Sequence, residues 1–394
     1  METATKIEGG QVSESYLSVD AEEFARALAR VCRVSPVSTR TIHEALTHVL
    51  VEPDLDGLRL VCTDLDLWAQ ATVPAAMSRD SGNFTVPARL LRSILRGAKG
   101  ELVIAAEGNT AQFSYGERRA RLGTGDASKF PKTNQQVEER YDMPGLVGML
   151  SLVTPAASDD PSRPFLCSVL FEPERLVATD THRLHMVEHN CDLTGWPERG
   201  VIVPISILGS LRMVLGAGTD SVIGVGLSAS EYDVATGIEF RLGNVSLATR
   251  LNPDLGYPNY RSKRILPDVY PCEHEWLIGA HELLAACAFL TPLAAGDRGR
   301  VSIEHILPGE LRLAAESDMG SASVIIPLDA AGTSGEPGYR IGMSARYLAD
   351  AVRMTCSQSV RIRLGKPTNP VYVTPAESDT PLAVVMPMQH KAVE

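Results

Sequence analysis

The feature that most constrains this chain is a type of segment that occurs three times along it. In each copy a Pro or Ser precedes an amphipathic helix, and short strands with alternating apolar residues follow the helix. The three helix segments are residues 86–95, 203–211 and 343–352, and the strands expected after them are 102–105, 221–225 and 360–364. A helix of a second type opens each third of the chain, at residues 21–33, 143–153 and 279–290.

Two helices and several strands in each third predict an α+β fold built from three repeats of one domain, each with two helices packed on antiparallel sheet. Pro-containing breaks at residues 130–136 and 265–271 mark the expected linkers. We therefore expect an N-terminal extension at 1–15 and domains at 16–137, 138–267 and 268–394. Chance similarity is the alternative explanation of so weak a repeat.

Targeting signals and cysteine motifs are absent from the sequence. No run of eighteen apolar residues occurs, and the first sixteen residues are polar and acidic. Seven cysteines are scattered without a Cys-x-x-Cys pair, which indicates neither a disulfide framework nor a zinc site. We expect a soluble cytoplasmic protein with reduced thiols, without a cofactor or metal and without a membrane partner.

Positive charge is concentrated and patterned in the first third of this acidic chain, whose net charge is -11. Residues 1–137 hold 16 Lys and Arg against 17 Asp and Glu, whereas each later third has an excess of five acidic residues. Arg26, Arg30 and Arg33 fall on one side of the first expected helix, and Arg89, Arg92, Arg96 and Lys99 on one side of the next. A solvated helix face is the ordinary explanation. Two nearly pure cationic stripes favour phosphate contact that does not read base sequence.

The densest titratable cluster is residues 179–189, with Asp180, His182, His185 and His189. These residue types can bind zinc or iron. The flanking residues predict strands, however, in which alternation places 180, 182 and 184 on one face and 185 and 189 on the other. Cys167 is more typical of a core thiol than of a nucleophile, and no catalytic motif of a hydrolase or nucleotide-binding enzyme occurs. A metal hydrolase that uses Asp180, His182 and His185 is therefore the weaker hypothesis, and we expect no catalytic residue.

The C-terminal residues 383–388 predict a last strand that ends in Met386, Pro387 and Met388. Two methionines that flank a proline provide a deformable apolar surface, suited to several partners.

At these places the sequence resembles the bacterial DNA polymerase III beta subunits, the ring-shaped sliding clamps. Residues 177–184 (VATDTHRL) resemble the "ATDGHRL" strand of that family, residues 257–267 its "FPDYRRVLP" segment, and residues 384–388 its "YVVMPM" end. The resemblance runs in order from about Tyr16 to Gln389. It implies three like domains per chain and a head-to-tail homodimer of six domains around duplex DNA.

The resemblance also implies a pocket for partner peptides between the second and third domains. Its wall would consist of Leu166, Thr179, Thr181, His182, Arg183, Leu184, Pro258, Ile265, Pro370, Val384, Met386, Pro387, Met388 and Gln389. Four features depart from the family: Thr181 stands where Gly is usual, His185 where a small residue is usual and Gln389 where Arg is usual, and residues 262–264 lengthen one loop. A divergent second clamp with its own set of partners is therefore an open alternative to the main clamp.

For the DNA-facing charges we predict Arg26, Arg30, Arg33, Arg40, Arg89, Arg92 and Arg96, with smaller contributions from Arg212, Arg346 and Arg353. For the dimer interface the matching positions are Leu122 in the first domain and Phe289 and Leu290 in the third. The implied partners are double-stranded DNA, the replicative polymerase, an ATP-driven clamp loader and other proteins with a clamp-binding motif.

Overall fold

The computed structural model describes residues 16–389, apart from 37–42, 55–56, 78–81, 133–136, 138, 230–233, 262–264 and 268–269. The N-terminal extension, Arg40 and the lengthened loop at 262–264 therefore lie outside the described residues. Among the residues that are described, no helix is both long and apolar enough to span a bilayer.

One order of elements occurs three times: a strand, a helix, three strands, a further strand, a second helix and three last strands. The first third, with one additional short strand, contains β1 (Leu17–Asp20), α1 (Ala21–Val31), β2 (His48–Asp54), β3 (Gly57–Thr63), β4 (Leu67–Val73), β5 (Ala75–Met77), β6 (Phe84–Pro87), α2 (Ala88–Ile94), β7 (Glu101–Glu107), β8 (Thr110–Tyr115) and β9 (Arg118–Gly123). The second contains β10 (Glu139–Pro144), α3 (Leu146–Val153), β11 (Ser168–Phe171), β12 (Arg175–Thr179), β13 (Arg183–Glu188), β14 (Val201–Pro204), α4 (Ile205–Leu215), β15 (Val222–Ala229), β16 (Ala235–Leu242) and β17 (Val245–Arg250). The last contains β18 (His274–Gly279), α5 (Ala280–Ala294), β19 (Arg300–Leu307), β20 (Glu310–Ser317), β21 (Gly320–Pro327), β22 (Arg340–Ser344), α6 (Ala345–Met354), β23 (Ser359–Leu364), β24 (Val371–Pro375) and β25 (Leu382–Val385). Short 3₁₀ turns are η1 (Glu44–Thr47), η2 (Ala127–Lys129), η3 (Thr154–Ala156) and η4 (Ala295–Asp297).

This order confirms the expected α+β fold with three repeats. The helices form where the sequence predicts them because each has apolar residues to bury, and two of them, α1 and α6, are also capped by a side chain. Asp20 accepts a hydrogen bond from the Glu23 N–H at 2.8 Å and so caps α1. Ser344 caps α6 in the same way, from the Tyr347 N–H at 3.3 Å. Phe24 is fully buried on the core side of α1.

Strand pairing between neighbouring thirds is the feature that sequence periodicity did not predict. The last strand of the second third, β17, pairs antiparallel with β4, the fourth strand of the first third. In the same way β25 pairs with β13, the fourth strand of the second third. Two eight-stranded sheets result, in the orders β10-β15-β16-β17-β4-β3-β2-β6 and β14-β11-β12-β13-β25-β24-β23-β18. The other two sheets are β5-β1-β7-β8-β9 and β21-β20-β19-β22.

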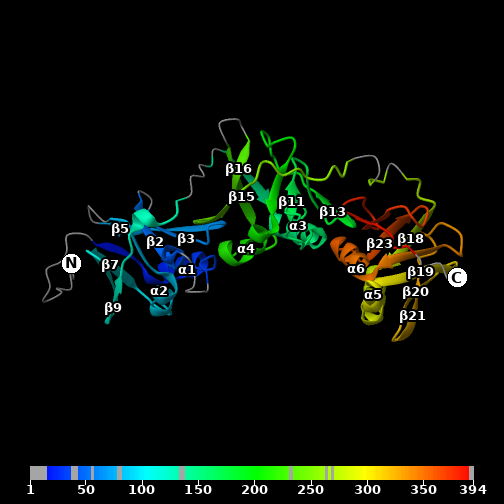
Figure 1. Ribbon diagram of the computed structural model, residues 1–394, viewed down its shortest axis with the longest axis horizontal. Helices are drawn as coiled ribbons and strands as arrows, with labels where there is room; N and C mark the ends of the chain where they lie inside the picture. The colour runs from blue at the N-terminus through cyan, green and yellow to red at the C-terminus, as the bar shows by residue number, and fades with distance from the viewer. Residues whose placement is uncertain are drawn as a thin grey trace. The chain divides into compact units, whose positions relative to one another are not determined.

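These shared sheets divide the chain into two compact units that do not coincide with the thirds. Unit 1 comprises residues 1–144 and 209–251, and unit 2 comprises 145–208 and 252–394. Within unit 1, α1 and α2 lie side by side, and within unit 2 α5 and α6 do the same (Figure 1). The division passes through the second third because its strands are shared between two sheets.

Candidate partner-binding surface and DNA-facing helices

The turn between β12 and β13 is built by the side chains of Thr179 and Asp180. The Asp180 carboxylate accepts the backbone N–H groups of His182 at 2.9 Å and Arg183 at 3.0 Å. Thr179 Oγ1 donates to the Arg183 carbonyl at 2.6 Å and accepts the Thr181 N–H at 3.1 Å. This arrangement places Thr181 at φ 77°, in the left-handed region that favours glycine.

The same turn occurs between β3 and β4, at the equivalent place in the first third. Asp64 there accepts the N–H groups of Asp66 at 3.0 Å and Leu67 at 2.7 Å, and Thr63 accepts that of Leu65 at 2.9 Å. Leu65 has φ 82°. The repeat therefore extends to individual hydrogen bonds.

Alternation along β13 sends its side chains to two different surroundings. Leu184 and Met186 belong to an apolar cluster on one face of the sheet, while His185 lies on the other face and its Nδ1 is 2.9 Å from the Leu152 carbonyl of α3. Because a carbonyl only accepts, Nδ1 carries the proton. Burial lowers the pKa of His185 to about 4.

The apolar cluster that contains Leu184, here called the linker-covered cluster, crosses the junction between β13 and β25. Its buried members are Leu170, Val177, Leu184, Met186, Tyr260, Tyr372, Leu382 and Val384, with Ile202, Tyr257, Ile265 and Leu266 packed against them. The segment that follows β17 covers it. The Tyr257 hydroxyl donates to the Val177 carbonyl at 3.2 Å, and the Tyr372 hydroxyl donates to that of Leu266 at 3.2 Å.

A buried carboxylate anchors the same segment. Glu172 accepts a short hydrogen bond from the Tyr260 hydroxyl and pairs with Arg261 at 2.8 Å. Burial, together with the Glu172 hydrogen bond, raises the pKa of Tyr260 to about 12. The tyrosine therefore stays a donor at neutral pH.

Residues 386–389, which we call the strap, leave β25 and are tied at both ends. The Met386 N–H donates to the His182 carbonyl at 2.8 Å, and the Met388 N–H donates to the Gly342 carbonyl at 2.8 Å. Arg300 Nη1 donates to the Gln389 carbonyl at 2.9 Å. Met386 is 36% exposed, so an apolar side chain is held at the surface by fixed backbone.

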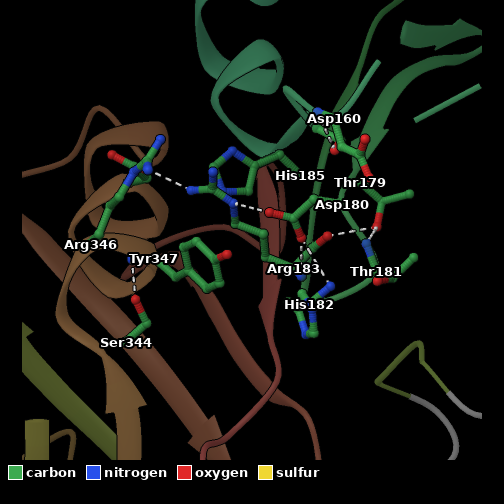
Figure 2. A network of polar contacts seen from close by, with 12 residues as sticks. Asp160, Thr179, Asp180, Thr181, His182, Arg183, His185, Ser344, Arg346 and Tyr347 are labelled. Carbon is green, nitrogen blue, oxygen red and sulfur yellow. Dashed lines mark hydrogen bonds and ion pairs between the residues drawn. The ribbon is translucent and has the colours of Figure 1, made fainter. Parts of the chain in front are cut away.

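Arg183 lies on the opposite face of β13 from Leu184 and is almost fully buried, while its place in a pocket wall stays a prediction. Only 4% of the residue is exposed. Its guanidinium pairs with Asp180 at 3.0 Å and Asp350 at 2.6 Å, and its Cζ lies 4.2 Å from the centroid of the Tyr347 ring (Figure 2). The alternation of β13 forces this, because adjacent residues of a strand cannot share a face.

Most of the other predicted pocket residues lie in three groups. Leu184, Ile265 and Val384 lie in the linker-covered cluster, Thr179, Thr181 and His182 in the β12–β13 turn, and Met386, Pro387, Met388 and Gln389 in the strap. Leu166 and Pro370 are buried and Pro258 is half-buried outside those groups. The linker-covered cluster also contains Val177, Met186, Tyr257, Tyr260 and Tyr372, which were not among the predicted pocket residues. Period-two alternation from Leu184 would have found Met186.

The residues of the metal hypothesis are not brought together. The Asp180 carboxylate is occupied by two N–H groups and Arg183, and His185 is bonded to α3 on the other face. Across the described ranges, no three His, Cys, Asp or Glu side chains are grouped as a metal site requires. Cys167 Sγ donates to the Asp160 carbonyl at 3.1 Å, and burial raises the pKa of its thiol.

Exposed cations of unit 1 lie on helices α1 and α2 and in the residues directly after each helix. Helix α1 ends at Val31 and α2 ends at Ile94, so Arg33, Arg96 and Lys99 lie beyond the helices and the cationic stripes are shorter than the sequence predicted. Arg26, Arg33, Arg89, Arg92, Arg96 and Lys99 are all exposed. No carboxylate of the described chain lies within 4.0 Å of their charged groups. Leu90 on α2 follows Arg89 and is 50% exposed.

The remaining predicted arginines differ in their surroundings. Arg30 is half-buried, and its guanidinium lies against Gly216, just beyond the C-terminal end of α4, where the helix dipole is negative. Arg212 on α4 is exposed. Arg346 and Arg353 on α6 both pair with Asp350, at 4.0 Å and 3.0 Å. Among the predicted DNA-facing residues that the structure describes, those without a carboxylate partner thus lie on or directly after α1 and α2, apart from Arg212 on α4.

The predicted interface residues also divide. Phe289 is 59% exposed on α5 and Leu122, in β9, is 8% exposed. Leu290 has no exposed surface, which corrects its assignment to the interface: it belongs to the core of unit 2.

Comparison with known proteins agrees with these observations. Residues 16–134 match the family model of the DNA polymerase III beta subunit, N-terminal domain. The chain is similar to the beta sliding clamp of Synechococcus elongatus, with 29% identity over 384 residues, 93% of this chain and 97% of the relative. It is 25% identical to the beta sliding clamp of Escherichia coli, over 94% of this chain and 99% of that protein.

Solved structures show the same likeness. The sliding clamp of Bartonella birtlesii bound to griselimycin is 26% identical, with a TM-score of 0.79 over 95% of this chain and 100% of that one. The DNA polymerase III subunit beta from Pseudomonas aeruginosa shares the fold, with a TM-score of 0.83 at 23% identity over 95% of this chain and 100% of that one. The N-terminal third of the chain thus matches the DNA polymerase III beta subunit family, and nearly the whole chain is similar to bacterial beta sliding clamps.

Proposed function

We propose that two copies of this chain close head to tail into a ring around duplex DNA, and that the ring tethers the replicative polymerase through the linker-covered cluster and the strap. The single observation that carries the ring is a pair of unused sheet edges. Edge strand β9 ends one sheet and edge strand β21 ends another.

These two edges are the same kinds of strand that pair inside the chain. Strand β9 is the last strand of its third, like β17 and β25, and β21 is the fourth strand of its third, like β4 and β13. An unpaired edge is a template for another strand. Pairing β9 of one copy with β21 of its partner repeats the internal junction twice, and two-fold symmetry closes the ring.

Contact with DNA rests on α1 and α2. Their exposed arginines supply charge for phosphates. Leu90, which follows Arg89 on α2, is exposed and apolar, and no aromatic residue that could stack on bases occurs between Arg89 and Lys99. Binding is therefore independent of sequence. A closed ring needs only weak attraction, since its topology prevents dissociation.

Partner binding rests on the strap and the cluster beside it. Met386 and Met388 offer deformable apolar side chains, while hydrogen bonds to His182 and Gly342 hold their backbone. A partner segment with apolar side chains gains affinity from such a preformed surface because little has to be ordered on binding.

The ring works without a catalytic site of its own, in the cytoplasm, and a separate ATP-driven loader opens it. A polymerase bound to the ring stays at high effective concentration near the primer end when its own DNA contact breaks. Other proteins with a clamp-binding motif compete for the same surface.

The ring is tested by sedimentation velocity at micromolar concentration. We expect a dimer for the wild type and a monomer for Ile325→Asp. Ile325 lies in β21 and is 54% exposed, so this substitution places a charge on the edge strand. The matched control is Leu307→Asp, at the 56% exposed end of β19, and it should stay dimeric. A monomeric wild type would exclude the proposal.

Partner binding is tested separately, by fluorescence anisotropy with a labelled peptide copied from the clamp-binding segment of the replicative polymerase. We expect micromolar affinity and displacement by griselimycin, which the Bartonella birtlesii clamp binds. Met388→Ala should weaken binding. A wild type that binds neither ligand would remove the partner-binding part of the proposal and leave the ring untouched.

A further inference from the structure

Arg183 is a charged side chain with almost no exposed surface. Its side chain, 3% exposed, reaches two carboxylates: Asp180 in its own turn and Asp350 on α6. The Tyr347 ring, one turn before Asp350 on the same helix, stacks against it (Figure 2). A buried cation must be compensated within the protein, and here Asp180 of the turn and Asp350 and Tyr347 of α6 share that role.

The pair joins segments that lie 167 residues apart in sequence. Asp350 is itself held by Arg353 at 3.0 Å and by Arg346 at 4.0 Å, both exposed cations on its own helix. The carboxylate therefore has a fixed place on α6. The ion pair then fastens the β12–β13 turn to that helix.

The strap is attached both to the β12–β13 turn and to the strand that leads into α6. One anchor is the His182 carbonyl, in the turn directly before Arg183. The other is the Gly342 carbonyl in β22, two residues before Ser344, which caps α6. Any change in the spacing between the turn and α6 therefore changes the spacing between the two anchors of Met386 and Met388.

We propose that Arg183 and Asp350 are a positioning pair for partner binding. They hold the two anchors of the strap at the spacing in which Met386 and Met388 accept a partner's apolar side chains, and Arg183 itself does not touch the partner. This inference rests on the proposed partner-binding function and names the residues that shape its surface.

The test is a double-mutant cycle with the labelled polymerase peptide. Asp350→Asn and Arg183→Met should each weaken binding about tenfold, and the double variant should bind no worse than the weaker single variant, because the two residues act through one contact. The matched control is Arg353→Gln, which removes an exposed partner of the same carboxylate. It should change affinity less than twofold.

A second readout does not depend on the peptide. Amide hydrogen exchange at Met386 and Met388 in the unliganded dimer should be faster in Asp350→Asn and Arg183→Met, and unchanged in Arg353→Gln. Asp350→Glu keeps the charge and should restore part of both the affinity and the protection. Thermal melting identifies any variant that fails to fold, and Asp350→Glu then carries the comparison.

Two results separate the proposals. If Arg183→Met weakens binding while Asp350→Asn leaves both affinity and strap exchange unchanged, Arg183 contacts the partner directly and the positioning pair is rejected. If the wild type binds neither the peptide nor griselimycin, the partner-binding function is rejected. The exchange of the strap amides still tests the positioning pair in that case.

Discussion

Two residues with side chains occupy turn positions that suit glycine. Thr181 and Leu65 have φ values of 77° and 82° at equivalent places in two thirds. An L-residue in this region costs roughly 1–2 kcal/mol. Both side chains are exposed, so removing them sacrifices little packing.

We predict that Thr181→Gly and Leu65→Gly each raise the free energy of unfolding by about 1 kcal/mol. Urea denaturation measures this, and Thr194→Gly, at an exposed position without positive φ, is the control. Because Thr181 is exposed, its substitution should alter partner affinity less than stability. A loss of stability in both glycine variants would show that the turns are not strained.

His185 links stability to acid. Burial lowers its folded pKa to about 4 from an ordinary 6.5, so the folded protein keeps the ring neutral while the unfolded chain takes up a proton. The contribution of the neutral His185 ring to the free energy of unfolding is complete above pH 6.5 and is lost as the pH falls from 6.5 toward 4. The loss reaches about 3 kcal/mol, since each pKa unit is worth about 1.4 kcal/mol.

The measurement compares unfolding free energies at pH 7.5 and 4.5 in wild type and His185→Gln. The variant should lose less stability between the two pH values, because it lacks the imidazole that takes up a proton on unfolding. Carboxylate effects are common to both proteins and cancel in the comparison. His182→Gln, at an exposed histidine of the same turn, should keep the wild-type difference. An unchanged pH difference in His185→Gln would contradict the assignment.

The predictions for adjacent residues of β13 came from different sources. Alternation correctly separated Leu184 from His185, and the same rule places Arg183 on the face of His185, opposite Leu184. The resemblance to a family supplied Arg183 as a pocket residue without regard to that face. Its half-buried partner Asp350 could not be predicted, because the contact depends on how α6 packs against β13.

At the scale of elements, the six helices of the described chain lie where periodicity and caps predict them. Strand existence was likewise predicted, as for β7 and β23. The junctions β17–β4 and β25–β13 were not, because hydrophobic alternation shows which face of a strand is buried and not which strand lies beside it.

The strap offers a prediction at this scale. A Cβ added to Gly342 would lie 2.6 Å from the Met388 carbonyl oxygen, so Gly342→Ala should push the strap away from β22. We expect partner affinity to fall about tenfold, roughly 1.4 kcal/mol, with little change in the rest of the fold. Anisotropy with the labelled peptide measures it.

Gly209→Ala is the control, because an added Cβ there meets nothing within 4 Å and replaces a helical glycine by a better helix former. It should bind the peptide normally and be somewhat more stable. Normal binding by Gly342→Ala would mean that the strap anchor is dispensable.

At the scale of the whole molecule, net charge is a poor guide to the partner. A chain of net charge -11 binds DNA in our proposal because a group of exposed arginines without carboxylate partners lies on and directly after α1 and α2. We predict that the double variant Arg92→Gln, Arg96→Gln has a shallower plot of log binding constant against log salt concentration. Its slope should fall in magnitude by about two, one for each phosphate that the variant no longer neutralises.

Titrations of short duplexes of two unrelated sequences between low and moderate salt measure this slope. The loss should be equal for both sequences, and Arg353→Gln, whose charge is already paired with Asp350, should change the slope little. A loss confined to one sequence would contradict contact with phosphates alone.

The sheets shared between thirds also determine the order in which a newly made chain can fold. Strand β4 is complete early, yet its neighbour β17 is synthesised much later: the contacts across this junction join residues 172 and 183 positions apart. Until then the growing chain exposes an open β4 edge on the ribosome. Contacts of such long range form slowly, and an open edge can pair with the wrong strand. Synthesis of this protein therefore passes through a period in which the first third cannot complete its sheet, and faster elongation or chaperone cover of β4 shortens the exposure.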